Sequence, residues 1–333
     1  MQANNHINIV AIGGGGGATQ VLKAVQPFAV QSTAVIAVTD TGRSTGLARA
    51  ISNIPAPGDL RATIAAFATE PLIADLLQHR LSGAGVPQLE GMAFGNLLIG
   101  ALAEVLGDFG DAIAHVIRLA GCTIQIVPIA KANTQLCAEL ADGTIVEGEF
   151  AVRGLGKPPI ARLFLRDAAV ASPLALKAIR DADLVVLGPG SLFTTVIANL
   201  LFDGVATALQ ETRGQVVYVC NTTTQPGQTD GFTTFDHVRW IVRTIGADVL
   251  DIALINHSHP DQAALRIYEE EGLFLLLPND EEIAAITSLG VQPVVRDLTE
   301  TVGEKRNMWN KQDTVRHDPK ALAIALRELI EEA

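Results

Sequence analysis

Residues 7–17 read INIVAIGGGGG, a short apolar run rich in isoleucine and valine that ends in five consecutive glycines. Apolar residues then recur at helical spacing from Ala18 to Val25. A strand that passes through a tight turn into a helix opens a β-α-β unit, the building block of a parallel sheet. This stretch therefore predicts an α/β fold.

The alternation of strands and helices recurs along the chain. A second strand is expected at 34–39, with a loop at 40–46 and a helix from residue 47. After the turn at 55–59, Asp59 is expected to cap a helix from Leu60. Further helices are predicted at 93–118, 171–182 and from residue 192, and further strands at 124–130, 183–187, 216–220, 250–255 and 273–277. His317, Asp318 and Pro319 begin a closing amphipathic helix that runs to Ala333.

One segment departs from this alternation. Leu136 to Val152 alternates around Asp142-Gly143, a strong signal for a hairpin turn, and residues 154–159 follow as a loop. The sequence therefore predicts a mostly parallel sheet with a small antiparallel hairpin beside it.

The composition supports this fold and narrows the function. Of the 333 residues 48% are hydrophobic and 18% charged, which allows a large core and argues against disorder. Aromatic residues make up only 5%, which suits helices on both faces of a buried sheet better than a β-sandwich. The net charge is -12 and no Lys/Arg run reaches five, so we expect no nucleic-acid partner. An anionic ligand must therefore be bound by local donors.

The sequence also predicts a cytoplasmic protein. Cys122, Cys137 and Cys220 lie far apart and form no C-x-x-C pair, which indicates a reducing compartment. Met1 to His6 shows no secretory signal. The apolar stretch 96–106 contains Glu104 and is about half of the roughly 20 residues that span a bilayer, so no membrane contact is expected.

Four predicted strand ends open into polar, glycine-bearing loops: 13–19, 40–46, 188–191 and 221–230. The carboxyl ends of parallel strands share one edge of a sheet, and ligands bind in the crevice there. Helix N-termini that follow such loops favour anions. These loops therefore predict a site for a phosphate-bearing, nucleotide-type ligand. The residues expected to bind it are Gly13, Gly14, Gly15, Gly16, Gly17, Gly188, Gly190 and Ser191. A glycine run after a strand is also compatible with tight helix packing alone.

A second interpretation of the first loop is a dinucleotide site. Gly13-x-Gly15-x-x-Ala18, with Asp40 further along, fits the fingerprint of a nicotinamide-binding oxidoreductase in which Asp40 bonds a ribose hydroxyl. A Walker-type site is less suitable because no Gly-Lys-Ser/Thr follows the loop.

Polar residues in the other loops complete the candidate site. Thr41, Arg43 and Ser44 are expected to contact phosphates, and Arg61 lies in a helix first turn, where a cation suggests an anionic neighbour. Asp40 is a candidate ligand of Mg²⁺ or acceptor of a proton. The remaining candidates are amides and a carboxylate that face or close the crevice: Asn96, Asn221, Gln225 and Asp230.

The order of these motifs resembles the gluconeogenesis factor family (YvcK-type), within the larger CofD-like group of 2-phospho-L-lactate transferases. The segments that carry the resemblance are 10–17 (VAIGGGGG), 38–46 (VTDTGRSTG), 57–61 (PGDLR), 94–98 (FGNLL), 136–144 (LCAELADGT), 187–192 (LGPGSL) and 219–231 (VCNTTTQPGQTDG). It implies a Rossmann-like three-layer α/β/α core, a single domain over 1–333 with a hairpin insertion at 133–160 and a C-terminal helix at 313–333 that packs on the core.

The resemblance implies two functions. The transferase branch joins a phospholactyl group to a deazaflavin alcohol with Mg²⁺ and releases GMP. The gluconeogenesis-factor branch, which the motifs match more closely, is associated with binding of UDP-sugars, notably UDP-N-acetylglucosamine, and with control of cell shape and cell wall. Thr41 and Arg43 depart from the family loop, which usually reads Asp-Asp-Gly-Gly-Ser-Ser-Gly, and this weakens a Mg²⁺ site.

We therefore expect a regulatory protein that binds a nucleotide sugar through a diphosphate, with Mg²⁺ at Asp40 as the only candidate cofactor. A homodimer is a further expectation. The rival is a CofD-like transferase in which Asp40 binds Mg²⁺ or takes a proton from the attacking hydroxyl.

Overall fold

A seven-stranded parallel sheet forms the centre of the protein. The computed structural model describes residues 7–28, 30–259, 262–299 and 317–332. Within them the strand order is β10-β9-β8-β7-β1-β2-β3. The strands are β1 (Ile7–Gly13), β2 (Val30–Ile36), β3 (Gln125–Pro128), β7 (Leu184–Leu187), β8 (Gln215–Val219), β9 (Ile252–Asn256) and β10 (Gln292–Arg296). Strand β1 pairs with β2 on one side and with β7 on the other. The order in which the chain adds strands to the sheet therefore reverses between β1 and β7, and open α/β sheets bind their ligands at such a point.

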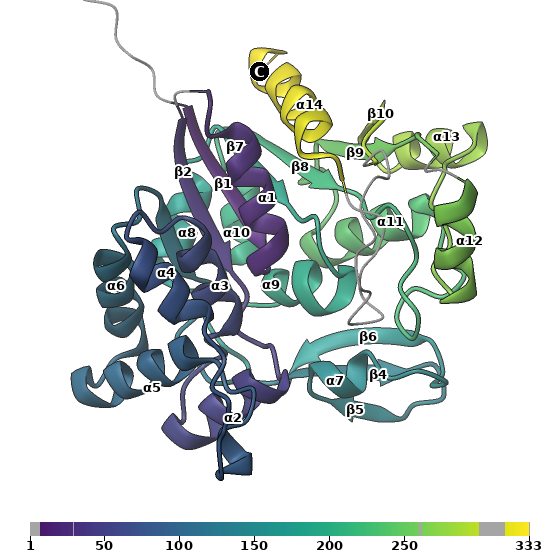
Figure 1. The fold of residues 1–333 in the computed structure, drawn as a ribbon. Coiled ribbons are helices and arrows are strands. Elements are labelled where there is room, and N and C mark those ends of the chain that lie inside the picture. The colour runs from purple at the N-terminus through teal and green to yellow at the C-terminus, as the bar shows by residue number, and fades with distance from the viewer. Residues whose placement is uncertain (1–6, 29, 260–261, 300–316, 333) are drawn as a thin grey trace, which may run out of the picture.

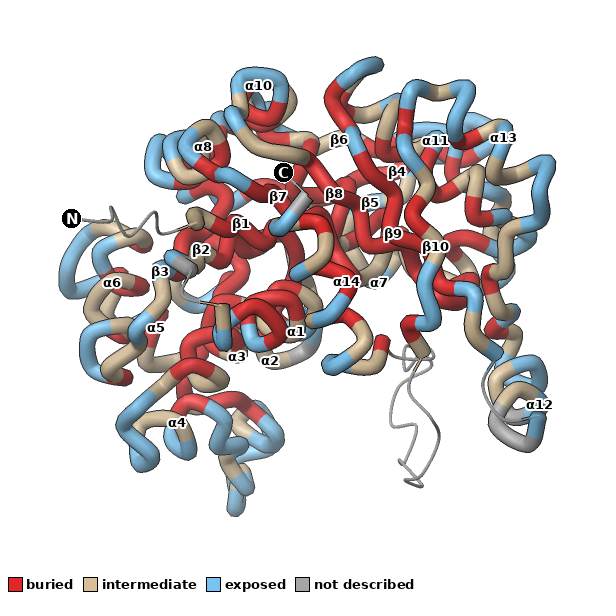
Figure 2. The backbone as a smooth tube through the Cα atoms, turned by 90° about the horizontal axis from the view of Figure 1, so that it is seen from above, coloured by how far each residue is buried: buried red, intermediate tan, exposed pale blue. Residues whose placement is uncertain are grey.

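Helices cover both faces of this sheet, as Figures 1 and 2 show: α1, α3 and α14 lie on one face, and α8, α10 and α11 on the other. The helices are α1 (Gly15–Val25), α2 (Arg43–Ser52), α3 (Gly58–Ala66), α4 (Pro71–Gln78), α5 (Phe94–Leu106), α6 (Phe109–Ala120), α8 (Pro173–Arg180), α9 (Ala198–Leu200), α10 (Val205–Gln210), α11 (Thr234–Ile245), α12 (Gln262–Glu270), α13 (Asp280–Ser288) and α14 (Pro319–Glu332). The valine- and leucine-rich β7 is buried along its whole length because both of its faces are covered. The predicted three-layer α/β fold is confirmed.

A second, three-stranded antiparallel sheet lies beside the carboxyl ends of the main sheet (Figure 1), in the order β5-β4-β6. Its strands are β4 (Leu136–Leu140), β5 (Ile145–Glu147) and β6 (Ile160–Leu165), with the short helix α7 (Glu149–Val152) after β5. The predicted hairpin is confirmed: Gly143 has a φ of 84° and the Thr144 amide donates to Asp142 Oδ1 at 2.9 Å. The sheet extends beyond the predicted insertion, because β6 pairs with β4.

Several predicted boundaries were wrong. The helix expected at 93–118 is two helices, α5 and α6, because Gly107 takes a left-handed conformation and Asp108 caps the next helix. Residues 273–277 form only an isolated bridge between Leu275 and Thr223, and the edge strand is β10, whose Pro293 and Arg296 hid it from the apolar pattern. Helix α2 already begins at residue 43.

The glycine run is divided between strand and helix. Strand β1 ends at Gly13, Gly14 caps α1, and residues 15–17 form the first helical turn. A methyl group at Gly14 or Gly15 would lie 2.7–2.8 Å from Asp59, and at Gly17 it would overlap the Pro189 carbonyl oxygen. At Gly16 it would meet no atom within 4 Å. Tight packing, the alternative that the sequence left open, therefore accounts for Gly14, Gly15 and Gly17 but leaves Gly16 unexplained.

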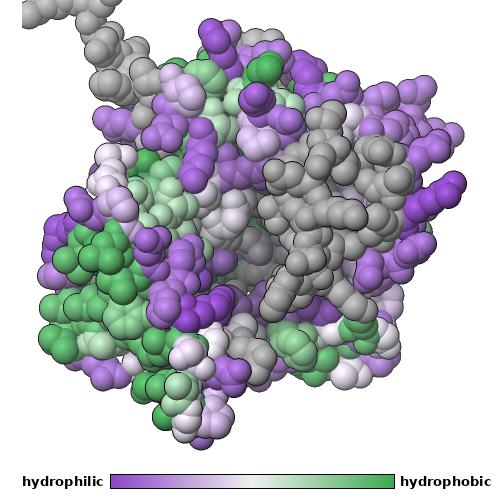
Figure 3. Space-filling model, viewed as in Figure 1, coloured by the Kyte–Doolittle hydropathy of each residue, from purple (hydrophilic) through white to green (hydrophobic). Residues whose placement is uncertain are grey.

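Apolar side chains gather on one surface, over α4, α5 and α6 (Figure 3). Leu72, Val105 and Leu119 are 70%, 81% and 52% exposed there. Large exposed apolar patches often mark contact surfaces, but the homodimer stays a prediction. No helix in the described ranges is both long and apolar enough to cross a bilayer.

Substitution of two neighbouring glycines will separate packing from function. We expect Gly17→Ala to lower the free energy of unfolding by at least about 1–3 kcal/mol, because the methyl group collides with backbone. Gly16→Ala should keep or raise it by up to about 1 kcal/mol, since alanine favours the helix. Urea denaturation of both variants measures this. A Gly17→Ala variant as stable as Gly16→Ala would contradict the packing described here.

Candidate functional site

A cavity of about 650 Å³ opens at the carboxyl ends of the parallel strands. All four predicted loops contribute to its wall, together with α7 and the start of α14. Of the predicted site residues, the structure brings together Gly14, Gly15, Gly16, Gly17, Asp40, Gly190, Ser191, Asn221 and Gln225. The crevice predicted from the strand ends is thus present.

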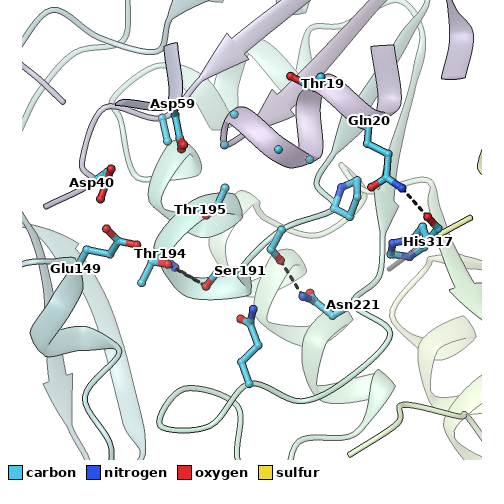
Figure 4. Close-up of a pocket in the computed structure, with 18 of the residues that line it drawn as sticks. Thr19, Gln20, Asp40, Asp59, Glu149, Ser191, Thr194, Thr195, Asn221 and His317 are labelled. Carbon is cyan, nitrogen blue, oxygen red and sulfur yellow. Dashed lines mark hydrogen bonds between the residues drawn. The ribbon is translucent and has the colours of Figure 1, made fainter. Parts of the chain in front are cut away.

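The first turn of α1 forms one wall of the cavity (Figure 4). The amides of residues 15–17 have no partner inside the helix, because the first intrahelical bond is donated by Ala18 to the Gly14 carbonyl at 3.2 Å. The Asp59 carboxylate accepts a hydrogen bond from the Gly15 amide. The open side of the helix end is at Gly16, where the helix dipole favours an anion.

The opposite wall is a π-helix over Leu192–Ile197. The Val196 amide donates to the Ser191 carbonyl five residues earlier, at 3.0 Å, and this wide turn lets both Thr194 and Thr195 line the cavity. Ser191 Oγ donates to Gln228 Oε1 at 2.8 Å and accepts from Thr194 Oγ1 at 2.9 Å. This wall therefore presents neutral hydroxyl and amide groups.

Carboxyl groups occupy one end of the cavity, where Figure 4 shows Asp40 and Glu149 facing one another. Their carboxyls are joined by a hydrogen bond, and Asp40 also accepts from the Gly42 amide at 2.7 Å. Glu149 forms an ion pair with Arg153 at 3.1 Å and accepts from the Thr41 amide at 3.2 Å. Thr41 thus attaches α7 to the main sheet.

These carboxyls have displaced pKa values. Burial, the hydrogen bond to Asp40 and its negative charge raise the pKa of Glu149 to about 8. Burial opposes ionisation of Asp40 too, but hydrogen bonds from Glu149, the Gly42 amide and Thr45 outweigh it and lower that pKa. Burial and repulsion from Asp40 raise the pKa of Asp59 to about 6. The Asp40–Glu149 pair therefore holds one proton at neutral pH.

Three predicted ligand residues instead bind one another behind the cavity. Arg61 Nε donates to Asn96 Oδ1 at 3.1 Å, and the same guanidinium bonds the Leu77 carbonyl and Gln78. Asn96 Nδ2 donates to Ser44 Oγ at 3.1 Å. These side chains join α2, α3 and α5, so the prediction that they face the ligand finds no support. The hydrogen bonds of Arg61 go to neutral oxygens, while the nearby carboxylates of Asp59 and Asp40 supply the negative charge expected beside it.

Other predicted residues lie around the cavity rather than in its wall. Gly13 and Gly188 exchange backbone bonds with the neighbouring strands, and Asp230 accepts from the Gly227 amide at 2.7 Å to shape its own loop. Asp59 is not the cap of α3, since Pro57 takes that position. Arg43 begins α2, and its side chain lies outside the described residues.

Sequence reasoning missed part of the wall: Gln20, Glu149, Arg153, Thr194, Thr195, His317 and Pro319. Asp59 was expected to cap a helix, and Thr19, Pro189, Thr222 and Gln228 lie in the predicted loops but were not singled out. Thr194-Thr195, separated by two residues from a Gly-Pro-Gly-Ser loop, was a usable signal. Glu149 and Arg153 could not be recognised as site residues, because no local sequence pattern shows that the segment after the hairpin, which contains α7, lines the cavity.

The residues do not fit the Mg²⁺ ion considered for Asp40. Within the described part of the chain, no group of three His, Cys, Asp or Glu residues is arranged to hold a metal ion. Asp40 and Glu149 bond one another, and Asp59 bonds the Gly15 amide. These carboxyl oxygens are satisfied by protein donors instead of pointing at one shared position.

Comparison with known proteins agrees with the fold and the loops. The chain matches the family described as 2-phospho-L-lactate transferase CofD over residues 9–299. It is 34% identical to the gluconeogenesis factor of Bacillus subtilis over 97% of this chain and 98% of that one. The chain belongs to the CofD family, among its gluconeogenesis factors. The gluconeogenesis factor of Halalkalibacterium halodurans is 38% identical over 76% of this chain and 78% of its own.

A crystal structure of a Bacillus halodurans protein shows that the CofD-family fold extends over the chain. It superposes with a TM-score of 0.87 at 32% identity and covers 97% of this chain and 100% of that one. The resemblance predicted from the motif order is confirmed.

Because Glu149 holds a proton in the folded protein at neutral pH, we expect the stability of the protein to depend on pH. A carboxyl whose pKa rises from 4.5 to about 8 on folding stabilises the folded state at low pH and loses that contribution as pH rises through 8. Glu149→Gln mimics the protonated acid, so its stability relative to the native chain should increase between pH 6 and pH 9. We expect a change above about 1 kcal/mol, comparable to one pKa unit.

Urea unfolding at the two pH values measures this difference. Glu147→Gln on the same hairpin is the control, because Glu147 lies outside the cavity wall and pairs with Arg166 at the surface. An equal Glu149→Gln effect at both pH values would refute the shared proton.

Proposed function

We propose that the protein binds a nucleotide sugar, such as UDP-N-acetylglucosamine, and acts in the cytoplasm as a regulator of carbon metabolism, cell shape and cell-wall synthesis. The observation that carries the proposal is the empty side of the helix end at Gly16. The names of the relatives support the link to carbon metabolism.

The diphosphate is the part of the ligand that this site suits best. Glycine at position 16 has no packing reason, but it allows phosphate oxygens to approach the free amides of α1. Gly190, Ser191, Thr194 and Thr195 line the same space. The Ser191 and Thr194 hydroxyls already donate to Gln228 and Ser191, so the donors that remain there among the described residues are the helix amides and the Thr195 hydroxyl. Such local donors can bind an anion although the whole chain is negative.

The rest of the cavity suits the remaining groups of a nucleotide sugar. Its volume, about 650 Å³, lies within the range of small-molecule sites. The carboxyl oxygens of Asp40 and Glu149 at one end are acceptors for sugar hydroxyls. Arg153 is already paired with Glu149, so its positive charge is not available to a second anionic group, and that end of the cavity does not suit one.

One observation favours a second candidate, a CofD-like transferase. A protonated Glu149 beside an ionised Asp40 is an acid–base pair, and Asp40 could take the proton of a deazaflavin alcohol that attacks phosphorus with release of GMP. An NAD-dependent oxidoreductase has no support beyond the glycine spacing and the Asp40 that follows it in the sequence.

Filling the space at Gly16 should abolish tight binding without unfolding the protein. We expect Gly16→Ala to weaken UDP-N-acetylglucosamine at least tenfold, because the methyl group occupies the approach to the amides. Gly110→Ala is the matched control: Gly110 holds the same second position in α6, where the methyl group meets the movable end of Lys131 and lies 3.1 Å from Asp108 Oδ1. Titration calorimetry of both variants measures the affinities. Equal affinities would exclude a diphosphate at this helix end.

The three candidate functions differ in the ligand that stabilises the protein. Saturation at 100 times the dissociation constant adds about 2.7 kcal/mol to the unfolding free energy. We expect a thermal shift with UDP-N-acetylglucosamine and none with NAD. A shift with GDP and Mg²⁺ alone would favour the transferase, and a shift with NAD alone would exclude both other candidates.

A further inference from the structure

A histidine that the sequence analysis treated only as a helix start forms part of the cavity wall. His317 precedes α14, is 4% exposed and lines the cavity. Figure 4 places it beside Gln20 and Asn221, at the end away from Asp40 and Glu149. The two ends of the cavity therefore differ in chemistry.

The hydrogen bond of the His317 ring fixes its tautomer. Nε2 lies 3.1 Å from the Cys220 carbonyl oxygen, which can only accept, so Nε2 carries the hydrogen. Burial lowers the pKa of His317 to about 4, and the ring is neutral at physiological pH. Nδ1 is therefore a bare acceptor. No donor among the described residues bonds it, so an acceptor in the cavity wall is left for a ligand.

The position of the ring is fixed from two sides. Gln20 Nε2 donates to the His317 carbonyl at 2.6 Å. Asp318 accepts from the amides of Lys320 and Ala321 at 2.7 and 3.0 Å and so caps α14, which packs against α1. Held in this way, the ring has the fixed geometry that recognition of one donor requires.

The contact between Gln20 and His317 also sets the distance from His317 to the phosphate position expected at Gly16. Gly16 and Gln20 are four residues apart on α1 and lie on one face of it. One helical turn rises about 5.4 Å, so a group that follows a diphosphate at Gly16 reaches His317.

The difference in charge between the two ends of the cavity decides which end of the ligand lies beside His317. Around His317 the wall is formed by Thr19, Gln20, Asn221, Thr222 and Pro319, none of which carries a charge. Pro319 adds an apolar surface that suits the flat face of a base better than a polyhydroxylated sugar. At the other end, Asp40 and Glu149 offer acceptors for sugar hydroxyls.

We propose that His317 Nδ1 accepts a hydrogen bond from a neutral N–H or O–H donor of the nucleoside, which places the nucleoside between α1 and α14 and the sugar beside Asp40 and Glu149. This inference rests on the proposed function and adds the orientation of the ligand to it. His317 is then a specificity-determining residue.

Two substitutions separate recognition from a structural role. In His317→Gln the amide nitrogen replaces Nε2 and keeps the bond to Cys220, but the Nδ1 acceptor is lost. In His317→Asn the amide oxygen replaces Nδ1, but the side chain no longer reaches Cys220. Recognition predicts that glutamine impairs binding more than asparagine, whereas a structural role predicts the reverse order.

Titration calorimetry of the full chain with UDP, UDP-N-acetylglucosamine and inorganic pyrophosphate tests this. His317→Gln should weaken UDP and UDP-N-acetylglucosamine about threefold to tenfold, as expected for one hydrogen bond, and leave pyrophosphate unchanged. His317→Asn should retain more affinity for the nucleotides. Titrations with 2′-deoxy-UDP and 3′-deoxy-UDP assign the donor: weaker binding of one of them to the native chain, but not to His317→Gln, identifies that ribose hydroxyl, and equal binding of both identifies the base.

The remaining outcomes overturn the proposal. Unchanged nucleotide binding by His317→Gln refutes the role of His317 while the proposed function stands. Equal losses for pyrophosphate and nucleotide, or a lower melting temperature that accounts for the loss, show that the ring only supports the wall. If the native chain binds none of the nucleotides, the proposed function fails and the orientation fails with it.

Discussion

The close approach of α1 to the loop after β7 is the contact on which the rest of the architecture depends. Gly17 lies against the Pro189 carbonyl, and Gly14 and Gly15 lie against Asp59. Only residues without a side chain allow the helix end, the β7 loop and α3 to meet at one point. This meeting point lies where the strand order reverses, and it fixes the two walls of the cavity relative to each other.

Local patterns predicted the parts of this arrangement that depend on neighbouring residues. The apolar runs of β1 and β7, the glycine loops and the Asp142-Gly143 hairpin all follow from short-range preferences, and parallel strands place their loops on one edge. The packing role of Gly17 was not predictable, because Pro189 is distant in sequence. Arg61 shows the same limit: a cation in a helix first turn suggested an anionic neighbour, but only the fold shows that Asp59 and Asp40 supply the charge and that neutral oxygens accept its hydrogen bonds. His317 enters the site only because α14 packs on α1.

Electrostatics explains how a negative chain can contain carboxyls in the site proposed for an anion. Asp59 bonds the Gly15 amide, and Asp40 and Glu149 share a proton, so less negative charge faces the cavity than the composition implies. Thr41, where the family loop usually carries a second Asp, uses its amide and hydroxyl to hold residues 149 and 150. In this chain that position therefore connects the small sheet to the cleft.

The π-helix after Ser191 serves the cavity and the core together, because Leu192, Phe193, Val196 and Ile197 are buried in the core while Thr194 and Thr195 line the cavity. Its extra residue widens one turn so that two adjacent threonines share a surface, whereas successive residues of an α-helix are rotated by about 100°. Shortening the segment by one residue would restore regular pitch and turn one of these hydroxyls away from the cavity. Insertions and deletions should therefore be tolerated less here than in the neighbouring surface helices.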